Sequence, residues 1–169
     1  PRPLRLLKLL SQNEYSVDIM SWNNKYDISK HYNNHFILQR FSDRIFKKNF
    51  RRLLKIIQII SFNKKIYSII SAKILRVEKN SHLYNKYDLV IIEDIEFLPL
   101  LALNKQNYKI IFDMREYYPL QEENNIYFKI IEKQRRHWIL KKFLKSCDIL
   151  YTVSNGLARK YFTEYGVNV

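Results

Sequence analysis

Residues 87–118 read YDLVIIEDIEFLPLLALNKQNYKIIFDMREYY, and this stretch decides the fold. Its two short apolar runs, LVII at 89–92 and IIF at 110–112, each lead into acidic residues, with a short helical segment between them. The pattern predicts a β-α-β unit. Because the strands are apolar on both faces, we expect a parallel sheet covered by helices on each side. The predicted fold class is therefore α/β.

Charged residues follow both predicted strands. Glu93 and Asp94 come after the first strand, and Asp113, Arg115 and Glu116 close the second. In open α/β sheets, ligands bind beyond the carboxyl ends of the strands, so a site is expected here. Clustered carboxylates repel one another, so we expect Arg115 to pair with one acid while another accepts a hydrogen bond from a ligand. A turn cap at Asp113 and a structural clamp at 115–116 are the alternatives.

Length and composition limit the class of protein. The chain has 169 residues, which is the size of one domain with a substantial core. A formal charge of +14 favours a polyanionic partner, although biased nucleotide composition of the gene would also enrich lysine. The single cysteine, Cys147, excludes an intrachain disulfide and favours a reducing compartment. With no apolar run of about 20 residues and no signal peptide, we expect a cytoplasmic protein.

Local sequence patterns predict the other helices and strands. A helix opened by proline is expected at the start of the chain, followed by strands at 17–22 and 35–41 with a loop at 23–34 between them. A helix with apolar spacing over 66–77 leads toward residue 87. A further strand is expected at 147–153 and a helix at 157–165, with Ser154 as its N-cap and Gly166 as its stop.

Two predicted helices are strongly basic. Over residues 43–60, apolar residues recur at steps of four and three, which is typical of one helical face. This face consists of Phe46, Phe50, Leu53, Ile57 and Ile60, and the flanking cations are Lys47, Lys48, Arg51, Arg52 and Lys55. Such a helix is suited to an anionic membrane surface, although a solvated helix packed on a sheet has the same pattern.

The second basic helix is expected over 124–146. Its apolar positions suggest a buried stripe of Tyr127, Ile131, Trp138 and Ile139. Its cations suggest a second basic surface, made of Lys133, Arg135, Arg136, Lys141, Lys142 and Lys145.

Several chemical signatures are missing from the sequence. The four histidines and one cysteine lack the spacing of a metal site, and no glycine-rich phosphate loop or nucleophile elbow is present. We therefore expect no metal and no complete enzyme. Most of the 13 tyrosines fall in predicted strands and helices, which favours packing over stacking on bases and argues against nucleic acid.

The ordered motifs resemble the N-terminal domain of the GT-B glycosyltransferases, especially family 4. They are Pro1-Arg2-x-x-Arg5, YDLVIIED at 87–94, FDMREYYP at 112–119 and DILYTVSNGLA at 148–158, ending near Tyr165-Gly166-Val167. The resemblance implies a Rossmann-like three-layer domain over 1–169 that forms one half of a GT-B fold and binds the sugar acceptor. Their position at the strand ends makes Glu93 and Asp94 the catalytic candidates, and Ser154 and Asn155 join the other strand-end residues as substrate-binding candidates.

The resemblance also implies parts outside this chain. The first strand with its glycine-containing loop, and the C-terminal domain that binds the nucleotide-sugar donor, are expected to be missing, so the chain should be inactive alone. Family members commonly have histidine in place of Glu93 and in place of Arg115, so this sequence departs from the pattern at both positions. The second change keeps a cation but removes a group that titrates near neutrality.

These observations lead to two functional hypotheses. The first is the acceptor half of a retaining, hexosyltransferase-like enzyme that acts on a polysaccharide or glycolipid, such as capsule or lipopolysaccharide, at the inner face of the membrane. It needs no cofactor in this domain. The alternative is a non-enzymatic basic α/β module that binds nucleic acid or another polyanion.

Overall fold

The computed structural model describes residues 2–21, 32–37, 45–61, 63–75, 87–105, 107–122 and 124–169. The chain divides into two compact units, Pro1–Ser42 (unit 1) and Asp43–Val169 (unit 2). A single domain over the whole chain stays a prediction.

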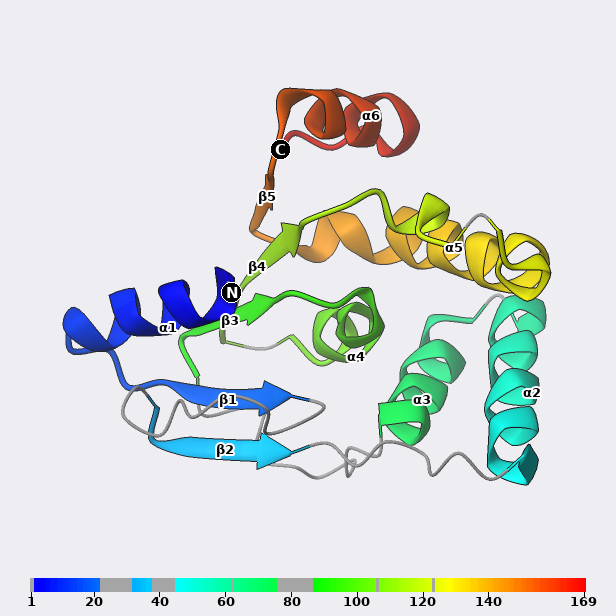
Figure 1. The fold of residues 1–169 in the computed structure, drawn as a ribbon, viewed down its shortest axis with the longest axis horizontal. Coiled ribbons are helices and arrows are strands. Elements are labelled where there is room, and N and C mark those ends of the chain that lie inside the picture. Colours follow the sequence, from blue (N-terminus) through cyan, green and yellow to red (C-terminus); the bar gives the residue numbers. More distant parts are fainter. Residues whose placement is uncertain are drawn as a thin grey trace. The chain divides into compact units, whose positions relative to one another are not determined.

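In its described residues, unit 1 holds one helix and two parallel strands (Figure 1). They are α1 (Arg2–Gln12), β1 (Asp18–Ser21) and β2 (Asn34–Ile37). Asp18 Oδ1 accepts hydrogen bonds from the backbone N–H of Asn34, at 3.0 Å, and from its side-chain amide, at 2.9 Å. The predicted helix and both strands are confirmed where they are described. Most of the predicted loop, and the predicted strand beyond Ile37, lie outside the described residues.

Unit 2 is an α/β domain with a three-stranded parallel sheet flanked by helices, Rossmann-like in architecture (Figure 1). The strands are β3 (Leu89–Ile92), β4 (Lys109–Met114) and β5 (Ile149–Thr152), in the order β3-β4-β5. Between β3 and β4 lie a 3-10 turn, η3 (Ile95–Phe97), and α4 (Leu98–Leu103). The β-α-β unit predicted from residues 87–118 is therefore confirmed.

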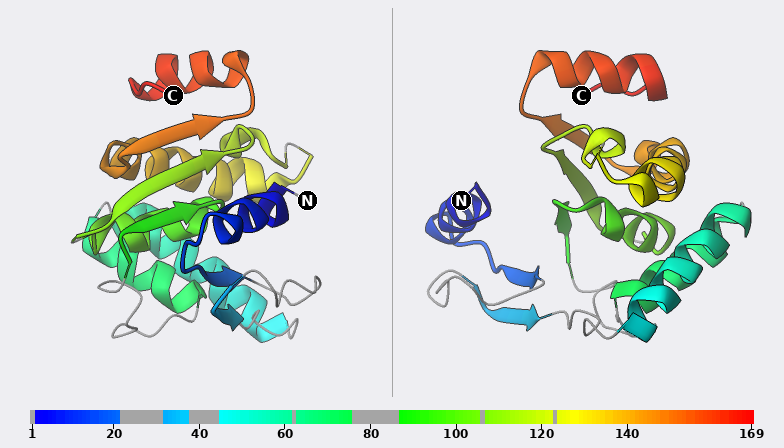
Figure 2. Two further views of the ribbon diagram at one scale, coloured as in Figure 1. Left: turned by 90° about the vertical axis from the view of Figure 1, so that its left-hand side faces the viewer. Right: turned by 45° about the vertical axis from the view of Figure 1, so that its right-hand side comes forward.

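The remaining helices of unit 2 form layers beside this sheet. They are α2 (Ile45–Ser61), α3 (Lys64–Leu75), α5 (Lys133–Phe143) and α6 (Asn155–Tyr165), with short turns η4 (Tyr118–Leu120), η5 (Phe128–Glu132, a π-helix) and η6 (Leu144–Ser146). Figure 2 shows α4 and α5 on the same side of the sheet. α3 packs against α4, and α2 packs against both α3 and α5. Among the described residues, no helix has the length and apolar content that crossing a bilayer requires.

The core lies between the sheet and these helices. Ile110, Phe112 and Met114 are buried on one sheet face, against residues such as Leu98 and Ile139. On the other face, side chains including Leu89, Ile149 and Tyr151 are exposed. Within unit 2, the predicted burial of both faces is therefore confirmed for one face only.

Both predicted ends of α6 are confirmed. The Ser154 hydroxyl accepts a hydrogen bond from the backbone N–H of Leu157 at 3.3 Å, which satisfies one of the free donors of the first turn. Gly166 ends the helix with φ of +63°, in the left-handed region that glycine adopts without a Cβ clash.

Candidate functional site

The candidate site is the carboxyl edge of the three-stranded sheet. Because β3, β4 and β5 are parallel neighbours, the residues that follow each strand reach the same edge. Glu93 and Asp94 follow β3, Arg115 and Glu116 follow β4, and Ser154 comes two residues after β5. The structure thus places the residues predicted from sequence along one edge.

Arg115 makes the central contact of this edge. Its Nη2 donates to Glu93 Oε2 in a part-buried ion pair, and its Nε lies 3.9 Å from Asp113 Oδ2. Asp113 is the last residue but one of β4 and is buried. The prediction that Arg115 pairs with an acid is confirmed. When all three are ionised, the group carries two carboxylates and one cation, so its net charge is −1.

Tyrosine hydroxyls hold the backbone around this group. The Tyr118 hydroxyl donates to the carbonyl of Glu93 at 3.1 Å, and the Tyr161 hydroxyl donates to the carbonyl of Glu116 at 2.8 Å. Both rings are buried, and burial raises the pKa of each phenol. The two phenols therefore stay protonated near neutral pH and act as fixed donors that position the loops after β3 and β4.

Some candidate residues have local structural contacts. Asp94 Oδ1 accepts a hydrogen bond from the backbone N–H of Glu96 at 2.9 Å and so caps η3. Glu116 Oε1 accepts from Gln121 Nε2. Ser154 caps α6, and Asn155 is the exposed first residue of that helix. Of the set, the Glu93, Arg115 and Asp113 side chains are the ones brought into a single charged group.

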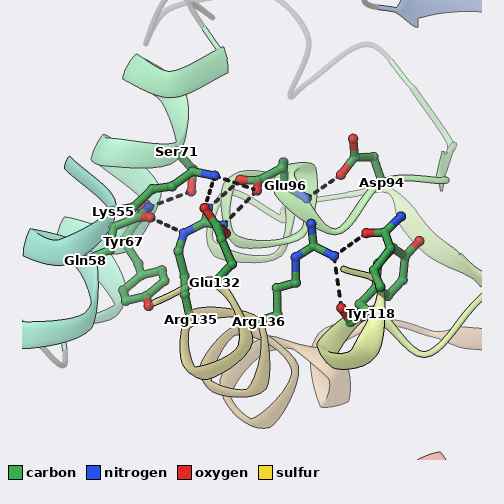
Figure 3. A network of polar contacts seen from close by, with 11 residues as sticks. Lys55, Gln58, Tyr67, Ser71, Asp94, Glu96, Tyr118, Glu132, Arg135 and Arg136 are labelled. Atoms are coloured by element: carbon green, nitrogen blue, oxygen red, sulfur yellow. Dashed lines mark hydrogen bonds and ion pairs between the residues drawn. The ribbon is translucent and has the colours of Figure 1, made fainter. Parts of the chain in front are cut away.

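A second charged group, not foreseen from sequence, lies inside unit 2 (Figure 3). Arg135 on α5 is fully buried, and its guanidinium lies within hydrogen-bonding distance of three side chains. The distances are 2.7 Å from Nη1 to Glu96 Oε1, 3.2 Å from Nη1 to Glu132 Oε2 and 2.7 Å from Nε to Gln58 Oε1. Lys55 Nζ also donates to Glu132 and lies 3.8 Å from Glu96 Oε1.

We call these five residues the buried charged network: Lys55, Gln58, Glu96, Glu132 and Arg135. Their burial contradicts two predictions made from the sequence. The sequence pattern predicts Arg135 on a basic surface and Lys55 on a membrane-facing surface, and both predictions are wrong because the two side chains are buried. Each cation is buried because a buried carboxylate lies within reach to offset the cost of removing its charge from water. The one sequence signal was Glu96, a carboxylate inside the apolar run IEFLPLL, which requires a partner if buried.

The network lowers the pKa of Glu96. Burial alone would raise the pKa of Glu96, but the charges of Arg135 and Lys55 and the hydrogen bonds from Arg135 hold that pKa well below its usual range. Burial lowers the pKa of Lys55, while the charge of Glu96 opposes this. Two carboxylates and two cations thus form a balanced group that joins α2, η3, η5 and α5.

The remaining membrane-surface candidates differ in their surroundings. Arg51 is half-buried, whereas Arg52 is exposed and its guanidinium carbon lies 4.9 Å from the centroid of the Tyr127 ring. Lys47 and Lys48 lie in α2, but their side chains are outside what the structure describes.

Within the described residues, no group of three or more histidine, cysteine or acidic side chains is arranged to hold a metal ion. Comparisons with protein-family models, with curated proteins and with solved structures found no match.

Proposed function

We propose that this chain is the acceptor-binding domain of a glycosyltransferase that moves a sugar from a nucleotide-sugar to a polysaccharide or glycolipid hydroxyl. The observation that carries the proposal is the group of Glu93, Arg115 and Asp113 at the carboxyl edge of the parallel sheet, where ligands of such folds bind. The order of the sequence motifs, which resembles that of family 4 enzymes, supports the same conclusion.

The chemical role of this edge is to bind and orient the acceptor. A carboxylate of this group accepts a hydrogen bond from a sugar hydroxyl, while the Arg115 guanidinium offsets part of the negative charge of the two acids. Holding the hydroxyl close to the anomeric carbon of the donor lowers the barrier, because part of the entropy cost is met on binding. The nucleotide-sugar itself is bound by a second domain in this proposal, and the enzyme works in the cytoplasm.

The alternative, a non-enzymatic module that binds nucleic acid, has less support from the structure. Burial of Arg135 and Lys55 removes two cations from the surface. Burial also withdraws several aromatic rings from base stacking: Tyr67, Tyr108, Tyr117, Tyr118 and Tyr161.

Substitution of the edge glutamates tests the proposal in an enzyme that contains this chain and the donor-binding domain. Glu93→Gln and Glu116→Gln are each expected to lower kcat/KM for the acceptor by the equivalent of about 1–3 kcal/mol, the cost of losing a charged hydrogen-bond partner. Melting temperatures should change little, because both side chains are part-exposed.

Glu122→Gln is the matched control, because Glu122 is an exposed glutamate in the turn after η4. Its acceptor kinetics should equal those of the unmodified enzyme. If the two edge variants lose stability and keep normal acceptor kinetics, the edge acids are part of the scaffold and the proposed site is wrong.

A further inference from the structure

Helix α2 is oriented by polar contacts on its inner face. Lys55 and Gln58 are buried, and Gln58 Nε2 donates to the carbonyl of Tyr67 and to the Ser71 hydroxyl on α3, both at 3.0 Å. Gln58 Oε1 in turn accepts from Arg135 on α5 (Figure 3). Rotating α2 about its axis would break these contacts and leave buried charges without partners, so the network fixes which side of the helix faces inward.

The outward side of α2 is apolar. Phe50 is 46% exposed, Leu53 52%, Ile57 41% and Ile60 69%. These four residues, which we call the α2 apolar face, follow one another at steps of three, four and three, so they line one side of the helix. A surface helix usually turns its apolar residues inward, but these four apolar residues of α2 are exposed while Lys55 and Gln58 are buried.

The charged residues of α2 and α3 are all basic. Residues 45–75, which span α2 and α3, contain eight lysines and arginines and not one aspartate or glutamate. Lys55 is neutralised by the buried network, but Arg52, Lys64 and Lys65 are exposed. On the next helix, α3, two further apolar residues are exposed: Ile66 at 38% and Ile69 at 45%.

We infer that α2, with the start of α3, is a docking surface for an anionic lipid bilayer, into which the α2 apolar face inserts. An exposed apolar stripe bordered by cations matches the two properties of such a bilayer, an apolar interior and a negative surface. A protein partner would explain the apolar stripe, but the absence of any acid over 31 residues matches a surface of one charge sign. The inference stands on α2 and α3 and does not rest on the transferase proposal.

Co-sedimentation of the 169-residue chain with vesicles tests this inference. Binding is expected to vesicles of phosphatidylcholine and phosphatidylglycerol in equal parts, and to be much weaker to pure phosphatidylcholine. Added salt should weaken it, since exposed charges are screened. Absence of binding to the anionic vesicles, or equal binding to both compositions, would overturn the inference.

Two sets of substitutions separate the apolar and the electrostatic contributions. The combined Leu53→Ser and Ile57→Ser variant should bind anionic vesicles at least roughly tenfold more weakly, because two inserting side chains are lost. Replacing Arg52, Lys64 and Lys65 by Gln should weaken binding on the order of 100-fold, since each cation contributes about fivefold.

Phe162→Ser is the matched control, because Phe162 on α6 is 58% exposed and should not affect binding. Melting temperatures report folding, and the single variant Ile60→Ser, at the most exposed position of the face, replaces the double variant if that one unfolds. If the chain instead forms a dimer that dissociates on Leu53→Ser and Ile57→Ser, the face is a protein interface. If the apolar variant keeps full vesicle binding, the face does not insert. Either result would overturn the inference.

Discussion

Arg135 is the charged residue on which the interior of unit 2 depends most. It is fully buried, and its guanidinium is shared between Glu96, Glu132 and Gln58. Such a group contributes little net stability when complete, since desolvation offsets the attraction, but it is costly to break. Arg135, Glu96 and Glu132 therefore depend on one another, because removing any one of them weakens the pairing of a buried charge.

Replacing Arg135 by methionine should therefore destabilise the protein severely. Arg135→Met removes the cation and leaves Glu96 and Glu132 with Lys55 alone, at an expected cost of about 3–5 kcal/mol in the free energy of unfolding. Urea denaturation measures this change. Lys141→Met, an exposed lysine on the same helix, is the control and should change the value by less than about 0.5 kcal/mol. A loss below about 1 kcal/mol in Arg135→Met would show that the network is not closed as described.

Glu96 makes the stability of the protein depend on acid pH. Its pKa in the folded protein lies well below the ordinary value of 4.5, so the folded state binds fewer protons than the unfolded state near that pH. The stability that Glu96 contributes is therefore fully present above about pH 4.5 and is lost as pH falls toward the folded-state pKa.

The unfolding free energy, measured by denaturant titration from neutral pH to about pH 3, should fall more steeply in the unmodified protein than in Glu96→Gln. The variant will be less stable at neutral pH, because Arg135 and Lys55 lose their shared acid. Identical slopes for the two proteins would mean that Glu96 is not held ionised in the folded state.

At the scale of the elements, a single residue determines each end of helix α6. Gly166 has φ of +63°, and a Cβ placed there would have no atom within 4 Å, so only backbone conformation opposes a larger residue. Gly166→Ala should cost about 1–2 kcal/mol, the penalty for an L-residue in the left-handed region.

Gly156, at the other end of α6, supplies a control for which the expected stability change has the opposite sign. Gly156 lies within α6 with no positive φ, and its added Cβ would approach only the Ser154 hydroxyl, at 4.0 Å. Gly156→Ala should leave stability unchanged or raise it by up to about 1 kcal/mol, because alanine has less chain entropy to lose in a helix. Thermal unfolding compares the two. A loss of stability at both positions would argue against conformational strain as the cause.

At the scale of the whole molecule, the main core belongs to one unit. The cluster of buried apolar residues runs from Tyr67 to Val167, and the smaller pair of Leu54 and Ile70 also lies in unit 2. A polypeptide of residues 43–169 should consequently fold by itself, with a cooperative thermal transition and the dispersed amide spectrum of a packed domain. A non-cooperative transition with collapsed amide shifts would show that residues 1–42 are needed for the core.

Much of the architecture was predictable because it is encoded locally. The apolar runs that became β3 and β4, the Ser154 cap and the Gly166 stop each depend on neighbours within a few residues. Parallel strand topology then places the residues after β3, β4 and β5 at one edge, so the candidate site also followed from sequence. That Arg115 would pair with an acid was predictable, whereas the choice of Glu93 needed the structure.

Tertiary structure decided which side of each helix is buried. Residues 43–60 showed that Phe50, Leu53 and Ile57 share a face, yet periodicity reports only which side chains lie together and not which of them meet a neighbour. That outcome was set by pairs distant in sequence, such as Lys55 with Glu132, 77 residues apart, and Arg135 with Glu96, 39 residues apart. A buried charge needs its partner at atomic distance, and only the packed chain brings such partners together.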